Sequence, residues 1–261
     1  MCAMNPRLLR PTSSTLDSDT AVYLNAVAQA DGQQLEPAVR KAINDFVVGC
    51  KRDNIWNAIK ASCILAGART LSGALIPLKG AAPTNNGPFV SGDYDRKGLA
   101  GNGSTKYLDS NRANNTDPQD SNHHAVWVVT ADSSGAARSY MDGGGTNTGA
   151  NNIGRSVTTA NLFLRNRSST VSNQAFGSAT GLVGTSRSAS TGYTLRASTT
   201  NTTITQASQT PDSGNVFIYS RGATNVTNAK LAWYSIGESV DLALLDARLS
   251  TLITAIGAAI P

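Results

Sequence analysis

Residues 143–197 read GGGTNTGANNIGRSVTTANLFLRNRSSTVSNQAFGSATGLVGTSRSASTGYTLRA, within a longer stretch, 131–230, that decides the fold. About half of that stretch is Ser, Thr, Asn or Gly, and it contains no Glu. Surface helices need Glu, Lys, Gln and Ala, whereas short polar side chains and turn formers favour short strands joined by tight turns. The composition therefore predicts a β-sandwich or a β-barrel.

The same stretch carries the net charge of the chain. Its basic residues are Arg138, Arg155, Arg165, Arg167, Arg187, Arg196, Arg221 and Lys230, and its acidic residues are Asp132, Asp142 and Asp212. The balance equals the formal charge of +5 of all 261 residues. Because the arginines are scattered, we expect a mildly basic solvated sheet and no direct nucleic-acid binding, although an anionic glycan or an acidic protein would also suit such a face.

Strand candidates recur along the chain at a spacing of roughly ten residues, which is typical of a sandwich. The run Ala125–Thr130 is β-branched and aromatic, the pattern of a strand buried on both faces. Further strands are expected at residues 157–164, 193–197, 202–206, 216–219 and 230–236. We expect this β domain to span residues 68–238.

The flanking segments have a different texture. Residues 1–16 contain Pro6 and Pro11 and predict an extended arm, in which Leu8, Leu9 and Arg10 are the candidates for contact with a neighbouring subunit. Residues 17–67 show a helical period and predict a helical attachment region with three short helices, starting near Asp17, Pro37 and Asp53.

Residues 239–261 predict a C-terminal helix. Its apolar seam contains Leu245, Leu249, Leu252 and Ile256, and Ser239 or Asp241 can cap it. Two heptads are short for a coiled coil, so packing within the chain is favoured over a parallel bundle of several copies. No window of the sequence approaches a membrane span, and we expect no membrane insertion.

Cysteine usage indicates a reducing compartment. Cys2, Cys50 and Cys63 are odd in number, and none lies in the β region that a disulfide framework would staple. The N-terminus has no apolar segment of signal-peptide length. We therefore expect reduced thiols and folding in a cytoplasm.

The sequence offers no convincing catalytic or metal centre. Glu36 and Glu238 are the only glutamates and are far apart in the chain, which argues against the paired carboxyl groups of a glycosidase. His123 and His124 are adjacent on a strand and point to opposite faces, so they cannot chelate one metal together. We predict no catalytic residue and no required cofactor. Asp93, Asp95 and Asp109, in a loop-rich region, are weak candidates for a calcium site.

Carbohydrate contact would use exposed aromatic rings as stacking platforms. Tyr140, Tyr193 and Tyr219 are the candidates, and core packing is the alternative explanation for each. Gly143-Gly144-Gly145 lacks the Lys and Ser or Thr of a phosphate-binding loop, so we interpret it as a turn.

Two motifs carry a resemblance to a known group of proteins. GLAGNGSTKYL at residues 98–108 is similar to the early hairpin of concanavalin-A-like and laminin-G-like jelly rolls. LAWYSIGE at 231–238, followed by Leu242 to Arg248, resembles the terminal strand and helix of the versions found in tailed-phage virion proteins, as does the lead-in from Ala38 to Leu78. The resemblance implies a mainly β, jelly-roll sandwich within most of residues 35–261.

The resemblance also implies a function. We expect a non-enzymatic structural component of a virion, assembled in the host cytoplasm, that decorates the capsid or belongs to the tail, collar or fibre apparatus. Its partners would be other virion proteins and copies of itself. A host-glycan-binding adhesin is the alternative, and a glycan hydrolase ranks third, because the Glu-x-Asp-x-Glu pattern of the related glucanases is absent.

Overall fold

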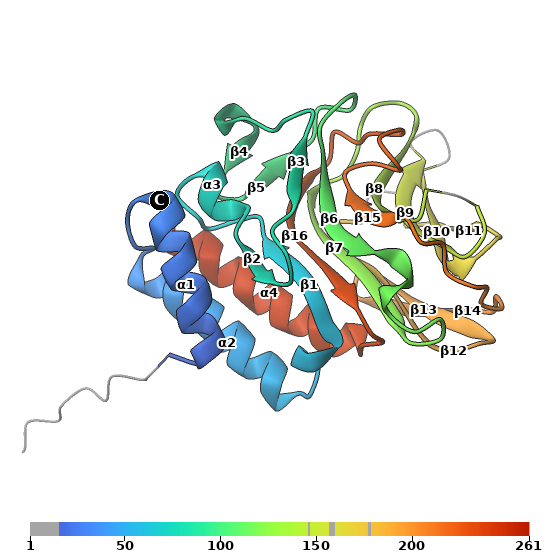
Figure 1. Cartoon of the computed structure of the whole chain (residues 1–261), viewed down its shortest axis with the longest axis horizontal. Helices are drawn as coiled ribbons and strands as arrows, with labels where there is room; N and C mark the ends of the chain where they lie inside the picture. Colours follow the sequence, from blue (N-terminus) through green and yellow to red (C-terminus); the bar gives the residue numbers. More distant parts are fainter. Residues whose placement is uncertain (1–15, 146, 157–159, 177–178, 261) are drawn as a thin grey trace, which may run out of the picture.

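The computed structural model describes residues 16–145, 147–156, 160–176 and 179–260. Within them the chain forms two antiparallel sheets that face each other as a sandwich (Figure 1). Sheet A contains β1 Ile59–Ile64, β2 Pro77–Lys79, β4 Tyr94–Asp95, β5 Gly98–Ala100, β7 Asn122–Thr130, β12 Gly181–Ala189, β13 Gly192–Ala197, β14 Thr200–Ile204 and β16 Lys230–Gly237. Sheet B contains β3 Thr84–Asn86, β6 Tyr107–Ala113, β8 Ala137–Gly143, β9 Ala150–Ser156, β10 Asn161–Ser168, β11 Ser172–Gln174 and β15 Asn215–Ile218. The predicted jelly-roll sandwich is confirmed.

The order of strands brings distant segments together. Sheet A runs β14-β13-β12-β7-β16-β1-β2, and β5 joins it through β16 and β4. Sheet B runs β11-β10-β9-β8-β15-β6-β3. The central strand β7 pairs with β12 and β16, and it is buried on both faces, as its β-branched sequence predicts.

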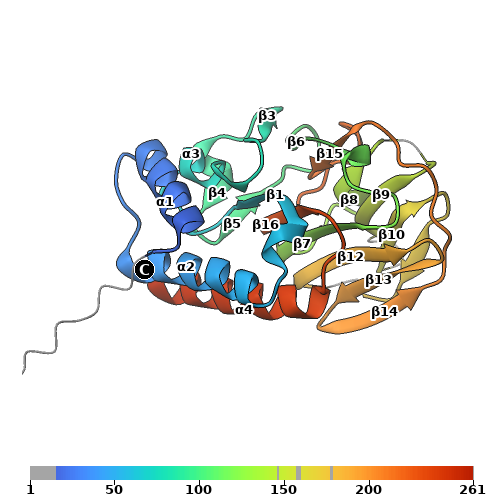
Figure 2. The same ribbon diagram turned by 60° about the horizontal axis from the view of Figure 1, so that its bottom comes forward.

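Alternation along β7 divides the interior into two apolar clusters. Val126 and Val128 point into the space between the sheets, while Ala125 and Trp127 point to the opposite face of sheet A. That opposite face is covered by helices, so sheet A is the middle layer of the molecule (Figure 2).

The helices follow local capping rules. Helix α1 (Ser18–Asp31) is capped by Asp17 and ends at Gly32, whose φ of 70° is left-handed. Helix α2 (Pro37–Arg52) has its proline in the first turn, and the short α3 (Leu71–Ala74) is capped by Thr70. Single 3-10 turns, η1 to η3, occupy Trp56–Ala58, Ser91–Asp93 and Asn114–Thr116.

Helix α4 (Leu242–Ala259) begins at the predicted cap Asp241 and lies beside α2, as Figure 2 shows. All four residues of its predicted seam, Leu245, Leu249, Leu252 and Ile256, are at most 1% exposed. The seam packs within the chain, so the preferred alternative is confirmed. By length and mean hydropathy (1.5) α4 also meets the criteria for a membrane span, so the expectation that no window approaches one is wrong. The buried seam accounts for this hydropathy.

The third predicted helix is wrong. After α2 the chain makes the 3-10 turn η1 and then enters β1, which lies between β16 and β2 in sheet A. A strand buried on both faces and a short buried helix both show a continuous apolar run, so periodicity does not separate them here. The helical region therefore ends at Arg52, and the sandwich starts at Ile59 instead of residue 68.

The predicted hairpin at residues 98–108 is also wrong, because its two strands belong to different sheets. β5 pairs with β4 and β16 in sheet A, whereas β6 pairs with β15 and β3 in sheet B. The side chain of Asn102 accepts hydrogen bonds from the backbone of Thr105 and Lys106 and holds the crossing turn. The strand expected at 157–164 starts later, at Asn161, and residues 157–159 lie outside the described residues.

Candidate functional site

The three tyrosines predicted to stack on sugars are core residues. Tyr140 and Tyr219 are 0% exposed and Tyr193 is 3% exposed, so none presents a ring face to solvent. The Tyr219 hydroxyl donates to the Leu99 carbonyl at 2.7 Å, and burial raises the pKa of Tyr219 far above its usual value. The glycan assignment to these residues is wrong, because all three rings face the interior: Tyr140 and Tyr193 from strands, and Tyr219 from the bend after β15.

The calcium candidates are not brought together. Asp93 forms an ion pair with Lys106, Asp95 forms one with Lys230, and Asp109 accepts from the Asn215 amide at 3.1 Å. Across the described parts of the chain, no three His, Cys, Asp or Glu side chains are grouped so as to hold a metal ion. Asp93 and Asp95 are thus already compensated by protein cations, and calcium would have to compete with them.

The two histidines lie on opposite faces of β7, as predicted. His123 places Nδ1 2.5 Å from the Glu238 carbonyl and Nε2 2.7 Å from the Ser235 hydroxyl, on the helix side of sheet A. His124 points between the sheets, with Nε2 3.4 Å from the Asn151 amide. Burial lowers the pKa of His123 to about 4, so the ring is neutral at pH 7 and holds strand ends together.

The free thiols agree with the expected reduced state. Cys50 and Cys63 are both buried and unbridged, and Cys2 lies outside the described residues. Burial raises the pKa of each described thiol to about 12, so neither supplies a thiolate nucleophile.

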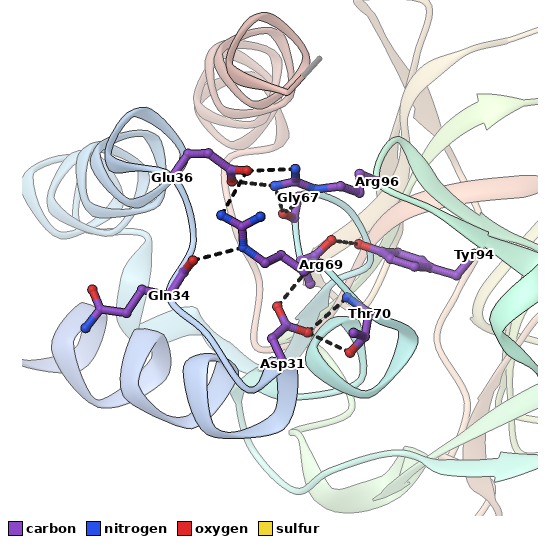
Figure 3. Close-up of polar contacts among 9 residues, drawn as sticks. Asp31, Gln34, Glu36, Gly67, Arg69, Thr70, Tyr94 and Arg96 are labelled. Atoms are coloured by element: carbon purple, nitrogen blue, oxygen red, sulfur yellow. Dashed lines mark hydrogen bonds and ion pairs between the residues drawn. The ribbon is translucent and has the colours of Figure 1, made fainter.

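A cluster of charged residues joins the helices to the sandwich (Figure 3). The Glu36 carboxylate receives two hydrogen bonds from Arg96, one at 2.9 Å and one at 2.5 Å, and it pairs with Arg69 at 3.1 Å. Asp31, at the end of α1, accepts from the backbone of Arg69 at 2.7 Å and of Thr70 at 2.9 Å. The hydrogen bonds from Arg96 lower the pKa of Glu36 to about 2. We call these five residues the clamp.

A groove of about 350 Å³ lies beside the clamp, between the C-terminal half of α4 and the end of β7. Its lining is mostly apolar and consists of Ala66, Arg96, Lys97, Trp127, Val128, Val129, Thr180, Gly181, Ile253, Ile256, Gly257 and Ile260. Arg96 is already paired with Glu36, while Lys97 is exposed and forms no ion pair with any described residue. Nothing in the groove resembles a catalytic constellation.

The face of sheet B that points away from sheet A carries a row of polar and aromatic side chains. The strand register places Arg165 of β10 opposite Asn152 of β9, Asn152 opposite Asp142 of β8, and Asp142 opposite Phe217 of β15. Asp109 of β6 continues the row beyond Phe217. Paired residues in neighbouring strands share a face, so we call this set the sheet B row.

A buried carboxylate lies at the centre of the sheet B row. Asp142 is 1% exposed and accepts from the Asn152 amide at 2.8 Å and from the Gly145 backbone at 3.0 Å. Burial raises the pKa of Asp142 to about 6. Nε of Arg221 lies 3.7 Å from the Asp142 carboxylate. Nη2 of Arg221 and Nη1 of Arg165 both donate to the side-chain oxygen of Asn147.

Two of the eight basic residues in the stretch 131–230 do not contribute to a solvated face. Arg167 and Arg187 are 0% exposed, and their guanidinium groups donate to backbone carbonyls, including Asp117 for Arg167 and Asn166 for Arg187. The expectation of a uniformly solvated basic sheet is therefore wrong, because these two cations tie loops to the sandwich. Burial lowers the pKa of Arg167 to about 10.

Sequence reasoning missed the sheet B row. Phe163 lies in the strand expected at 157–164, but Arg165 lies one residue beyond its end, so the prediction did not place the two side chains on one face. The pairing of Asp142 with Asn152 had no local signal, because it depends on the register between β8 and β9.

No protein-family model matches the chain, and no curated protein matches its sequence. Among solved structures, the binding domain of botulinum neurotoxin serotype D superposes with a TM-score of 0.51 at 9% identity, over 75% of this chain and 50% of that one. NanB sialidase from Streptococcus pneumoniae (K499G mutant) gives 0.44 at 12% identity, over 59% and 27%. Trypanosoma rangeli sialidase in complex with sialic acid gives 0.47 at 10% identity, over 76% and 33%.

The chain thus spans half or less of the length of these proteins. Identities this low show the fold alone, and sandwiches of one architecture serve both enzymes and binding domains. The superposition on the neurotoxin binding domain therefore supports a sandwich fold, and any argument for function has to come from the residues of this chain.

Proposed function

We propose that the protein is a non-enzymatic structural component of a tailed-phage virion, attached through its N-terminal segment and helices, with the sandwich displayed outward. The observation that carries the proposal is the placement of exposed apolar side chains. Of the large apolar side chains exposed among the described residues, Val22, Val48 and Leu244 lie on α1, α2 and α4, and Val90 is the fourth. An exposed apolar side chain gains free energy from burial when a neighbouring protein surface covers it.

The arrangement of the chain agrees with this polarity. Helix α1 begins at Ser18, directly after the predicted arm. A neighbouring subunit bound by Leu8, Leu9 and Arg10 would therefore lie near the helices. These three residues lie outside the described residues. In Figures 1 and 2 strands β8 to β11 of sheet B lie at the end of the molecule remote from α1. The proposal assigns attachment to one end and display to the other.

The carboxyl groups support the non-enzymatic part of the proposal. Glycoside hydrolysis needs an accessible pair, one of which holds a proton near neutral pH. Asp142 has the raised pKa, but its side chain is 1% exposed beneath Arg221. Glu36 has a lowered pKa, and Glu238 pairs with Lys60. Asp142 therefore lacks the exposure, and Glu36 the pKa, that an acid catalyst needs.

A particle-incorporation assay tests the proposal. Val22→Glu places a charge on the solvent-facing side of α1, where Val22 is 72% exposed, and should reduce the copies of the chain per purified particle several-fold. Thr203→Glu makes the same charge change on the exposed edge strand β14 and should leave the copy number unchanged. Equal incorporation of both variants, or absence of the wild-type chain from particles, would contradict the proposal.

Glycan binding is the second candidate function, and half-buried aromatic rings on sheet B favour it. Tyr107 and Phe217 form an edge-to-face pair with ring centres 5.6 Å apart, and Phe163 lies on β10 two residues before Arg165. These rings, unlike the three predicted tyrosines, are partly accessible and lie beside polar groups, as sugar recognition requires.

A further inference from the structure

Two arginines of sheet B converge on one neutral oxygen atom. Arg165 Nη1 and Arg221 Nη2 each lie 2.6 Å from Oδ1 of Asn147. Arg165 comes from β10, whereas Arg221 follows β15, so the fold brings together two cations that are far apart in sequence. Like charges repel, and a single amide dipole compensates two guanidinium groups less well than an anionic oxygen does.

Two guanidinium groups and one carboxylate meet in this part of sheet B. The nearest carboxylate, Asp142, approaches Arg221 at 3.7 Å, a longer contact than the hydrogen bonds of the clamp. Asp142 is 1% exposed, and it directs its oxygens to the Asn152 amide and the Gly145 backbone. Burial and then the charge of Arg221 lower the pKa of Arg165, while the charge of Asp142 raises it.

An aromatic ring, that of Phe163, lies on the same face of β10 as Arg165, two residues before it. Phe163 is half-buried and rests against the backbone of Gly154, where an added Cβ would come within 2.2 Å of the ring. The glycine therefore lets the ring lie close to the sheet. A pyranose ring stacked on Phe163 could direct a substituent toward Arg165, two residues along the strand.

We propose that Arg165 and Arg221 bind the carboxylate of an acidic saccharide, with one carboxylate oxygen replacing the Asn147 oxygen and the sugar ring resting on Phe163. The site belongs to the displayed sheet, so this inference deepens the glycan-binding candidate and rests on it. It needs no metal ion. It also assigns a role to the positive charge that the stretch 131–230 carries.

Two matched probes separate charge recognition from general sugar binding. Methyl β-D-glucuronide and methyl β-D-glucoside share a pyranose ring and differ in carrying a carboxylate or a hydroxymethyl group. In an NMR titration of the full chain, we expect the glucuronide to shift the arginine Nε–H signals of the wild-type protein. The glucoside should bind at least about tenfold more weakly, because it lacks a charged hydrogen-bond acceptor.

Variants identify the residues. Arg165→Gln and Arg221→Gln should each weaken glucuronide binding at least about tenfold. Lys97→Gln removes one exposed positive charge beside α4 and should change the affinity less than twofold. Asn147→Ala removes the exposed neutral competitor and should retain or strengthen binding, which keeps the test informative if an arginine variant folds poorly.

Equal affinity for the two sugars, unchanged binding in both arginine variants, or lost binding in Asn147→Ala would overturn the assignment. Inorganic sulfate binding as tightly as the glucuronide would show a site for free anions and would overturn the saccharide part. None of these results depends on the incorporation of the chain into particles, so failure here is distinguishable from failure of the structural role.

Discussion

Glu36 is the residue on which the contact between helices and sandwich depends, because it faces both Arg69 and Arg96. Glu36→Gln leaves two cations without a counter-charge and should lower the free energy of unfolding by about 1–3 kcal/mol at pH 7. Glu238→Gln is the control: Glu238 is 45% exposed in its pair with Lys60, so we expect less than about 1 kcal/mol. Urea denaturation measures both values.

The stabilisation from Glu36 depends on pH in a defined direction. Its pKa is about 2 in the folded chain against an ordinary value of 4.5, so the folded state binds fewer protons between these values. The contribution is complete above pH 4.5 and is lost as the pH falls toward 2. The difference between wild type and Glu36→Gln should therefore shrink across this range, and an equal difference at pH 7 and pH 2.5 would contradict the assignment.

The ionisation of Asp142 is expected to change the stability with pH in the opposite direction to that of Glu36. Its pKa is raised from 3.8 to about 6, so the unfolded chain releases the proton first and stability decreases as the pH rises through this range. Relative to Asp142→Asn, the wild-type protein should lose on the order of 2–3 kcal/mol between pH 4 and pH 7. His123 and His124 titrate in both proteins and cancel in the difference. A difference independent of pH would show that the carboxylate is not desolvated.

At the scale of elements, α4 stabilises the molecule through one side only. Leu249 is 0% exposed in the seam, and its replacement by Ala should cost about 2–5 kcal/mol of unfolding free energy, since a cavity remains. Leu244 lies on the same helix but is 40% exposed, and Leu244→Ala should cost less than about 0.5 kcal/mol. Comparable losses in thermal or urea denaturation would contradict the packing of α4 against α2 and sheet A.

Elements with a clear local signal could be predicted from sequence. The caps Asp17 and Asp241, and strands such as β13 and β16, agree with the structure because alternation and capping are local properties. β1 could not be separated from a helix, since a strand buried on both faces has no alternation. The hairpin at residues 98–108 failed because membership of a sheet depends on long-range pairing with β16 and β15.

The candidate site was predictable only in part, for the same reason. The charge of the stretch 131–230 predicted a mildly basic solvated sheet that an anionic partner would also suit, but Arg167 and Arg187 are buried, while Arg165 and Arg221 meet at one oxygen. Each tyrosine chosen as a sugar platform faces the core, since the side of a strand that faces inward is fixed by register and not by residue type.

At the scale of the whole molecule, the two ends differ in chemistry. The helical end exposes Val22 and Val48, while sheet B presents arginines, amides and half-buried rings. This polarity agrees with the proposed attachment at one end and display at the other, whereas a glycoside hydrolase would need an accessible pair of carboxyl groups.

The copy number of the chain in gradient-purified particles, measured by quantitative mass spectrometry, tests this account most directly. We predict a fixed number of wild-type and Thr203→Glu chains per particle and several-fold fewer Val22→Glu chains, with all three proteins folded to the same helix and strand content. Loss of the wild-type chain on purification, or equal copy numbers for the two variants, would contradict attachment through the helical side.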